Sequence, residues 1–323
     1  MIGDVTMVTR HGLNSNSGAV SVVMACYSME RLRGIVAAVH SIAAQTLQPA
    51  EIIVAVDHNR SLAHTLRREM PGICVISYED GPRGASGARN AGVAVVSTPY
   101  TAFIDDDEIA DSSWLSELIK PFADERVVGT GGRYRAVWRS PKPNWFPDEF
   151  GWVVGESFHG MPIETSRVRN VWSGSMAVRT AAFRAVGGFR VGFGKSGERS
   201  QPEDTDLCIR MAELGNDFHW MYVPTSVIDH DIPLERSTFR FFLARCYSEG
   251  KGKIELRDDR NGSEELDDER DYVRSVLTSG LRRYVLGGRV SLSRAGAVVA
   301  GIVSAGMGAL SAIVCRRRHF VGP

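Results

Sequence analysis

Short apolar runs alternate with segments of helical periodicity through the first third of the chain. Residues 20–26, 52–56 and 100–104 are apolar runs rich in β-branched residues, which is typical of strands buried in a parallel sheet. From Leu32 to Ala43 the apolar side chains recur every three or four residues, which predicts a helix with one buried face. Repeated strand–helix–strand units predict an α/β fold with a doubly wound, mostly parallel sheet flanked by helices.

The chain changes character after this region. Residues 131–160 hold tryptophans and phenylalanines among prolines, and a long loop of this kind usually has a function. Residues 295–315 carry no charge and are flanked by arginines, and about 20 apolar residues suffice to cross a bilayer. Small residues recur there at every fourth position, a ridge that suits packing against another helix or against the protein's own core. A membrane helix and a buried or surface-lying helix therefore both stay open.

The composition is that of a folded protein with balanced charge. Among 323 residues there are 38 basic and 38 acidic side chains, which argues against a protein that coats nucleic acid. The five cysteines are scattered without a Cys-x-x-Cys pair, so reduced thiols are expected rather than disulfides or a zinc site. Residues 1–18 lack the pattern of a signal peptide, and we expect a protein of the cytoplasm or of the cytoplasmic face of a membrane.

One apolar run ends in three carboxylates, Asp105, Asp106 and Asp107. Alternate residues of an extended backbone share a face, so Asp105 and Asp107 can point together. Hard oxygen ligands in this arrangement suit Mg²⁺ or Mn²⁺ holding a diphosphate. The alternative is an acidic turn that caps the helix predicted to follow it.

Two further segments carry candidate chemistry. Residues 84–92 are rich in glycine, which lets the backbone approach a ligand, and they include Arg89, which suits a phosphate. The alternative for this segment is a glycine-rich helix start with a surface arginine. Glu203 and Asp204 stand at the head of a predicted helix. Acids there complement the helix dipole, or one of them acts as a general base for an acceptor hydroxyl.

The order and setting of these segments resemble the family-2 glycosyltransferases of the GT-A fold. The resemblance covers residues 20–233 and rests on motifs that follow one another in the family's order: residues 21–27, 41–49, 51–57, 87–92, 105–107, 187–189 and 203–204. Residues 144–155 resemble a subgroup akin to glucuronosyltransferases that act on lipid-linked sugars. Residues 26–28 and 57–59 depart from the family's common Thr-Tyr-Asn and Asp-Gly-Ser, which leaves base and sugar selection open.

On the donor side, the resemblance implies roles for five residues. Asp57 would bind the nucleotide base, and Arg89 would lie near the nucleotide. Asp105 and Asp107 would be the carboxylates for metal and diphosphate, with Asp107 the direct ligand. His230 would complete the binding of a Mn²⁺ or Mg²⁺ cofactor, although a lone histidine near a turn is often only a surface residue.

On the acceptor side, the resemblance implies that Asp204 is the catalytic base, and the adjacent Glu203 is the alternative. Trp172 and Gly174, together with the aromatic segment 144–155, would shape the acceptor side, since sugars pack against ring faces. These residues complete the candidate active site.

The expected function is an inverting, metal-assisted transfer of a sugar from a nucleoside diphosphate sugar to a glycan or a lipid-linked acceptor. UDP is the expected nucleotide, and the C-terminal segment is the expected link to a membrane. One rival is a nucleotidyltransferase, which would carry a glycine-rich basic loop after its first strand, where this chain has Cys26-Tyr27-Ser28-Met29. The other rival is a non-catalytic protein that binds nucleotide sugars or glycans.

The expected domain organisation follows from these assignments. It comprises a disordered lead-in (1–17), a GT-A glycosyltransferase domain (18–235) with a nucleotide-binding half (18–130) and an acceptor half (131–235), a helical extension (236–290), and a membrane helix or its alternatives (295–315).

Overall fold

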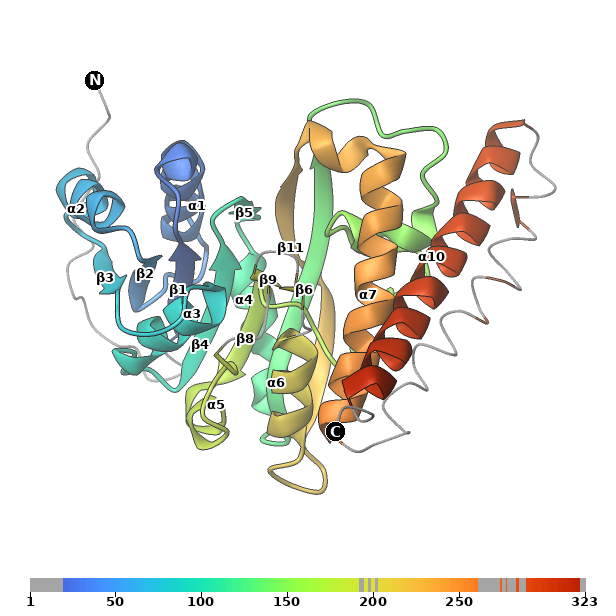
Figure 1. Ribbon diagram of the computed structural model, residues 1–323. Coiled ribbons are helices and arrows are strands. Elements are labelled where there is room, and N and C mark those ends of the chain that lie inside the picture. The colour runs from blue at the N-terminus through green and yellow to red at the C-terminus, as the bar shows by residue number, and fades with distance from the viewer. Residues whose placement is uncertain are drawn as a thin grey trace.

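The computed structural model describes residues 20–191, 195–196, 199–200, 203–260, 274, 277, 283–284 and 289–319. A single large sheet crosses the molecule with helices against it, and two long helices, α7 and α10, lie together beyond one end of that sheet (Figure 1). The lead-in predicted for residues 1–17 lies outside the described residues.

The first part of the chain alternates strands and helices as predicted. Its elements are β1 (Val20–Cys26), η1 (Met29–Arg31), α1 (Leu32–Ala43), β2 (Glu51–Asp57), α2 (Arg60–Glu69), β3 (Cys74–Tyr78), α3 (Ala85–Ala94), β4 (Tyr100–Asp105) and β5 (Glu108–Ala110). The remainder comprises α4 (Trp114–Ile119), η2 (Lys120–Ala123), β6 (Val127–Trp138), η3 (Asp148–Val153), β7 (Ser166–Val168), β8 (Ser175–Arg179), α5 (Thr180–Ala185), the short pair β9 (Lys195–Ser196) and β10 (Arg199–Ser200), α6 (Glu203–Ala212), β11 (His219–Ile232), η4 (Leu234–Ser237), α7 (Phe239–Arg260) and α10 (Arg289–His319).

The strands of the large sheet run in the order β3-β2-β1-β4-β8-β6-β11-β5, and β7 pairs with β11. Strand β1 is parallel to β2 and β4, and β2 is parallel to β3. The second half is mixed, because β8 is antiparallel to both β4 and β6 whereas β6 and β11 are parallel. The predicted α/β fold with a mostly parallel sheet is confirmed. The carboxyl ends of β1, β2 and β4 therefore meet at one edge, where ligands bind in sheets of this kind.

Strand alternation divides the core between the two faces of the sheet. In β1, Val22 and Met24 are buried in the cluster that contains side chains of α1, α2 and α4. Val23, between them in sequence, is buried in a second cluster with side chains of α3, α5 and α6. Successive strand residues point to opposite faces, so the continuous apolar runs in the sequence reflect a sheet covered on both sides.

A third cluster holds the long helices in place, and it gives residues 131–160, predicted to be a long functional loop, a packing role. The first part of that segment is the end of β6, and the aromatic side chains that follow are largely core. Phe146 and Phe150 are buried with Phe242 of α7 and Val298 of α10. The ring centroid of Phe242 lies 5.8 Å from that of Phe146 and 5.3 Å from that of Phe150. The aromatic composition therefore anchors the two helices onto the sheet.

Residues 295–315 fall within α10. Among the described residues, one stretch, Leu292–Val314, is long and apolar enough to cross a membrane by length and composition. The ridge of small residues faces inward: Ala297 and Ala305 pack in the third cluster, and Gly301 lies against Phe150 and Phe242. The packing of this ridge onto the protein's own core is one of the two outcomes that the sequence allowed.

Candidate active site

Four consecutive acids cross from β4 to β5. Asp105 ends β4, Asp106 and Asp107 form the turn, and Glu108 begins β5. Asp105, Asp107 and Glu108 each offer a carboxylate oxygen, and these atoms lie within 4.8 Å of one another. Glu108 is buried and accepts a hydrogen bond from the backbone N–H of Asp105 at 2.8 Å. Burial and the charge of Asp105 raise the pKa of Glu108 well above its usual range. Carboxylates this close repel unless a cation or a proton lies among them.

His230 lies beside this acid cluster. It lies within β11 and not near a turn. Because β11 pairs with β5, His230 stands opposite Glu108. Its Nδ1 is 3.0 Å from the carbonyl oxygen of Gly155, which can only accept, so we assign the proton to Nδ1. The lone pair of the neutral ring is then on Nε2, which lies 3.9 Å from Oδ2 of Asp107 and 3.4 Å from Nη1 of Arg236. Burial lowers the pKa of His230, which favours this neutral, metal-binding form.

Two arginines flank the acids. Arg89 of α3 is buried and donates from Nη2 to Oδ1 of Asp105 at 2.5 Å, while its guanidinium lies 5.4 Å from the ring centroid of Phe189. Arg31 of η1 pairs with Asp106, and its Nη2 is 3.5 Å from Oδ2 of Asp107. Arg89 was predicted from the sequence, whereas Arg31 was not. The available signal was a cation in the first helical turn after β1, at the ligand-binding edge of the sheet.

The two candidate bases stand in the first turn of α6. Asp204 accepts hydrogen bonds from the hydroxyl and the backbone N–H of Ser173, and burial raises its pKa. Its Oδ1 has no hydrogen-bond partner in the described part of the chain. Burial, followed by the charge of Asp204, raises the pKa of Glu203 to about 8. Both acids also interact electrostatically with Arg89, so α6 brings them to the same site as the acid cluster.

The segment from Trp172 to Gly174 connects the acid cluster to α6. Trp172 packs edge-on against Tyr134 at a centroid distance of 5.0 Å, and its carbonyl accepts the Tyr134 hydroxyl at 3.3 Å. Gly174 is buried against Glu108, and a Cβ at this position would overlap the Glu108 carboxylate. A glycine is therefore needed where β8 approaches the acids. Glu108 and Tyr134 were not among the residues selected from the sequence.

Asp57 lies at the same sheet edge but in its own network. It ends β2, two strands from β4. Its Oδ2 accepts the backbone N–H of Gly84 at 2.9 Å, and its Oδ1 is 2.6 Å from Nδ1 of His58. Gly84 has φ +140°, a conformation that side chains disfavour, and it immediately precedes α3, which carries Arg89. Asp57 thus links β2 to the glycine-rich segment.

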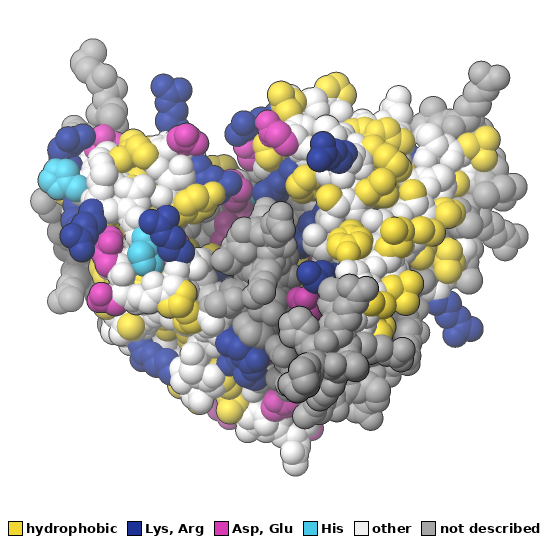
Figure 2. Space-filling model, viewed as in Figure 1, with side chains coloured by type: hydrophobic (Ala, Val, Ile, Leu, Met, Phe, Trp, Pro, Cys, Tyr) yellow, Lys and Arg dark blue, Asp and Glu magenta, His cyan; other side chains and the backbone are white. Residues whose placement is uncertain are grey.

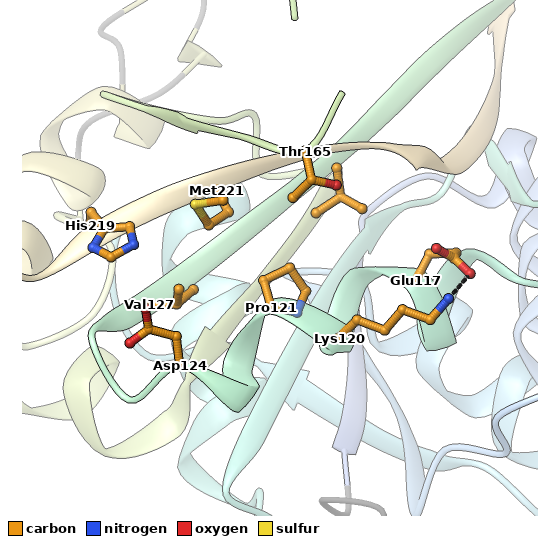
Figure 3. A pocket seen from close by; sticks show the side chains of 9 residues that line it. Glu117, Lys120, Pro121, Asp124, Val127, Thr165, His219 and Met221 are labelled. Carbon is orange, nitrogen blue, oxygen red and sulfur yellow. Dashed lines mark hydrogen bonds and ion pairs between the residues drawn. The ribbon is translucent and has the colours of Figure 1, made fainter. Parts of the chain in front are cut away.

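Figure 2 shows acidic and basic side chains gathered where the surface is hollowed, between the part that contains α1–α3 and the part that contains α7. A separate cavity of about 310 Å³ lies where β6 and β11 begin, away from the end of β11 that carries His230 (Figure 3). The residues that line it include Glu117 and Lys120, which form an ion pair, together with Val127 and His219. None of the site residues predicted from the sequence lines this cavity.

Comparison with known proteins identifies the family of this chain. The model of the family "Glycosyl transferase family 2" matches residues 21–187. A glucosyl-dolichyl phosphate glucuronosyltransferase of Haloferax volcanii is 28% identical over 262 residues, which cover 80% of this chain and 83% of that protein. A pre-mycofactocin glycosyltransferase of Mycobacterium tuberculosis is 26% identical and covers 60% of this chain and 44% of that protein. Among solved structures, GalNAc-T7 with UDP, GalNAc and Mn²⁺ has a TM-score of 0.52 at 15% identity, over 81% of this chain and 55% of that one.

Proposed function

Because this chain belongs to glycosyl transferase family 2, we propose that it moves a sugar, with inversion, from a nucleoside diphosphate sugar to a glycan or a lipid-linked acceptor. The observation that carries the proposal is the convergence on one hollow of a close acid cluster, a neutral histidine and a separate pair of acids on α6. A donor diphosphate and an acceptor hydroxyl need these two kinds of group side by side.

The acid cluster fits a divalent cation, Mn²⁺ or Mg²⁺. Asp105 and Asp107 supply hard oxygen donors, Glu108 lies within the same 4.8 Å, and His230 directs an unprotonated nitrogen toward Asp107. Asp107 is the proposed direct ligand, with His230 completing the set. When bound, the cation neutralises charge that develops on the departing diphosphate. GalNAc-T7, which shares the fold, has Mn²⁺ and UDP in its crystal structure, and this likeness supports the same choice of cofactor and nucleotide here.

The chain's own residues supply the remaining donor contacts. Asp57 is proposed to receive the nucleotide base, at the carboxyl end of β2. Arg89 holds Asp105 with one nitrogen, while its Nε and Nη1 have no hydrogen-bond partner among the described residues. A buried guanidinium with free donors is suited to a phosphate oxygen.

The acceptor hydroxyl is proposed to lose its proton to Asp204. Ser173 fixes one edge of this carboxylate with two hydrogen bonds, whereas the buried Oδ1 has no partner among the described residues and is the oxygen proposed to take the proton. Glu203 is the alternative base. Trp172 and Gly174 are proposed to line the acceptor side, since the segment that leads into β8 lies between the acid cluster and α6.

We propose the following division of the chain into domains. Residues 18–235 form the transferase domain, with the nucleotide half ending near 130 and the acceptor half near 235. Residues 236–290 are proposed to be a helical extension, of which α7 is described whereas most of residues 261–288 lie outside the described residues. Residues 295–315 are proposed to provide association with the cytoplasmic face of a membrane. The name of the Haloferax volcanii relative includes a dolichyl phosphate, which favours a lipid-linked acceptor.

Thermal unfolding with a panel of nucleotide sugars tests donor and metal together. A donor present at about 100 times its Kd should stabilise the protein by about 2.7 kcal/mol. We expect a shift with UDP-sugars and Mn²⁺ that disappears in EDTA and in Asp107→Asn, but persists in Asp217→Asn, which changes an exposed acid outside the site. A donor shift that is unchanged in EDTA would refute the metal assignment.

A further inference from the structure

Helix α10 has two contrasting faces. One face packs on α7: the Ser304 hydroxyl donates to the carbonyl of Leu243 at 2.8 Å, and a Cβ on Gly308 would overlap the backbone of Tyr247. The other face is an apolar stripe, whose large side chains are 48–62% exposed: Leu292, Val299, Val303, Met307, Leu310 and Val314. Spacings of mainly three, four and seven residues keep these side chains on one side of a helix.

The contact between α10 and α7 limits the orientation in which this stripe can contact a membrane. A Cβ on Gly250 of α7 would overlap the carbonyl of Ala305, so the two backbones lie in close contact near the middle of α10. At that level α7 is charged, with ion pairs between Arg245 and Glu249 at 3.5 Å and between Lys251 and Glu255 at 3.8 Å. If α10 crossed a bilayer in this packing, these charges would enter hydrocarbon, which is strongly unfavourable.

The charge around α10 matches an anionic surface. The whole chain has zero formal net charge, yet residues 272–323 carry eight arginines and no acidic residue. Two of these arginines, Arg283 and Arg294, pair with Glu149 and Asp148 within the fold. Arg316, Arg317 and Arg318 directly follow the apolar stretch. Only 22% of that stretch is buried in the fold, so the stripe is not explained as the core of a soluble protein. Figure 2 shows hydrophobic side chains gathered over the side of the molecule formed by α7 and α10. An apolar stripe beside a basic segment is the pattern of a helix lying in a membrane interface.

We propose that α10 lies in the plane of an anionic phospholipid bilayer, with its exposed stripe in the boundary between headgroups and acyl chains, and does not cross the membrane. This inference rests on the membrane association proposed above and defines its geometry. A second copy of the chain is a less suitable occupant of the stripe, because pairing would bring two strongly basic segments together. Helix α7 begins nine residues after His230, so a bilayer that holds α7 and α10 would also hold the acceptor side of the site at a set height.

Binding of the full chain to preformed vesicles tests whether the apolar stripe of α10 contacts the membrane. The vesicles contain phosphatidylcholine alone or phosphatidylcholine with phosphatidylglycerol. We expect sedimentation with the anionic vesicles, weakened by salt, and at least a tenfold loss of binding in Val303→Asp/Met307→Asp, since each buried apolar side chain contributes about that factor. Both side chains are more than half exposed, so thermal unfolding should stay near wild type. Ile163→Asp changes an exposed apolar residue outside the stripe and should bind vesicles like the wild type.

Accessibility of the carboxyl end tests the orientation. An epitope tag placed after Pro323 should be removed by protease added outside sealed vesicles that carry the protein on their outer surface. A protected tag on vesicle-bound protein means that α10 crosses, which overturns the in-plane proposal and leaves membrane association standing. Absence of vesicle binding overturns membrane association itself. If the double variant changes self-association measured by ultracentrifugation and leaves vesicle binding intact, the stripe is a contact between copies and the proposal is wrong.

Discussion

Gly174→Ala tests the packing of the acid cluster most locally. The added methyl group would overlap the Glu108 carboxylate, whose Oε2 accepts the backbone N–H of Asp105. Gly174 does not have a positive φ, so its backbone tolerates alanine and the effect comes from this overlap alone. The carboxylate must move, and the hydrogen bond that positions Asp105 is then lost or bent.

The size of the effect follows from these two changes. Overpacking a buried position costs about 1–3 kcal/mol, and a lost hydrogen bond to a buried group adds about 1 kcal/mol. We therefore expect the free energy of unfolding to fall by about 2–4 kcal/mol. Displaced neighbours of a metal ligand typically reduce metal affinity by about 10–100-fold, and we expect weaker Mn²⁺ binding in this range.

Urea unfolding and calorimetric titration with Mn²⁺ measure both quantities. Gly306→Ala is the matched control, because this helical glycine is exposed with open space around its Cβ, and alanine there should stabilise by about 0.5–1 kcal/mol. Glu108→Asp shortens the obstructing acid, so its cost and that of Gly174→Ala should not add. Wild-type stability and Mn²⁺ affinity in Gly174→Ala would refute the contact between Gly174 and the Glu108 carboxylate.

Two further substitutions separate the roles of the other site residues. Asp204→Asn should reduce turnover by about 10²–10⁴-fold, the usual contribution of a positioned base, while donor and Mn²⁺ binding stay near wild type; Glu203→Gln is compared with it, and full turnover in both variants would mean that neither acid is the base. His230→Ala should weaken Mn²⁺ binding by about tenfold or more without unfolding the chain, as followed by calorimetry and circular dichroism; an unchanged affinity would remove His230 from the metal site.

The parallel half of the sheet could be predicted because its strands carry their own signal. Strands β1, β2 and β4 are buried on both faces, so their sequences read as continuous apolar runs, and the acids after β4 stand out against them. The family assignment, the α/β fold and the enzyme class were predicted from these motifs and are confirmed. The individual roles of the site residues stay predictions.

Other features depend on pairing between distant segments; His230 was named through the family resemblance, whereas Glu108 was not named at all. Strand β11 mixes apolar and polar residues over Tyr222–Ile232, and only its register with β5 brings His230 to Asp107. In the sequence, Glu108 is only the fourth of four consecutive acids, although it is buried against Gly174, which directly precedes β8. The packing role of the aromatic segment 144–155 was not predicted, because its sequence does not reveal that α7 and α10 cover it.

Nucleoside diphosphate release is the most direct test of sugar transfer by this site. The full chain is incubated with UDP-sugars and Mn²⁺, with and without a membrane lipid extract as the source of acceptor, beside Asp204→Asn. We expect UDP release that requires both Mn²⁺ and the extract and that is lost in Asp204→Asn while donor binding persists. Release of pyrophosphate in place of UDP, or UDP release that is equal in wild type and Asp204→Asn, would contradict the account.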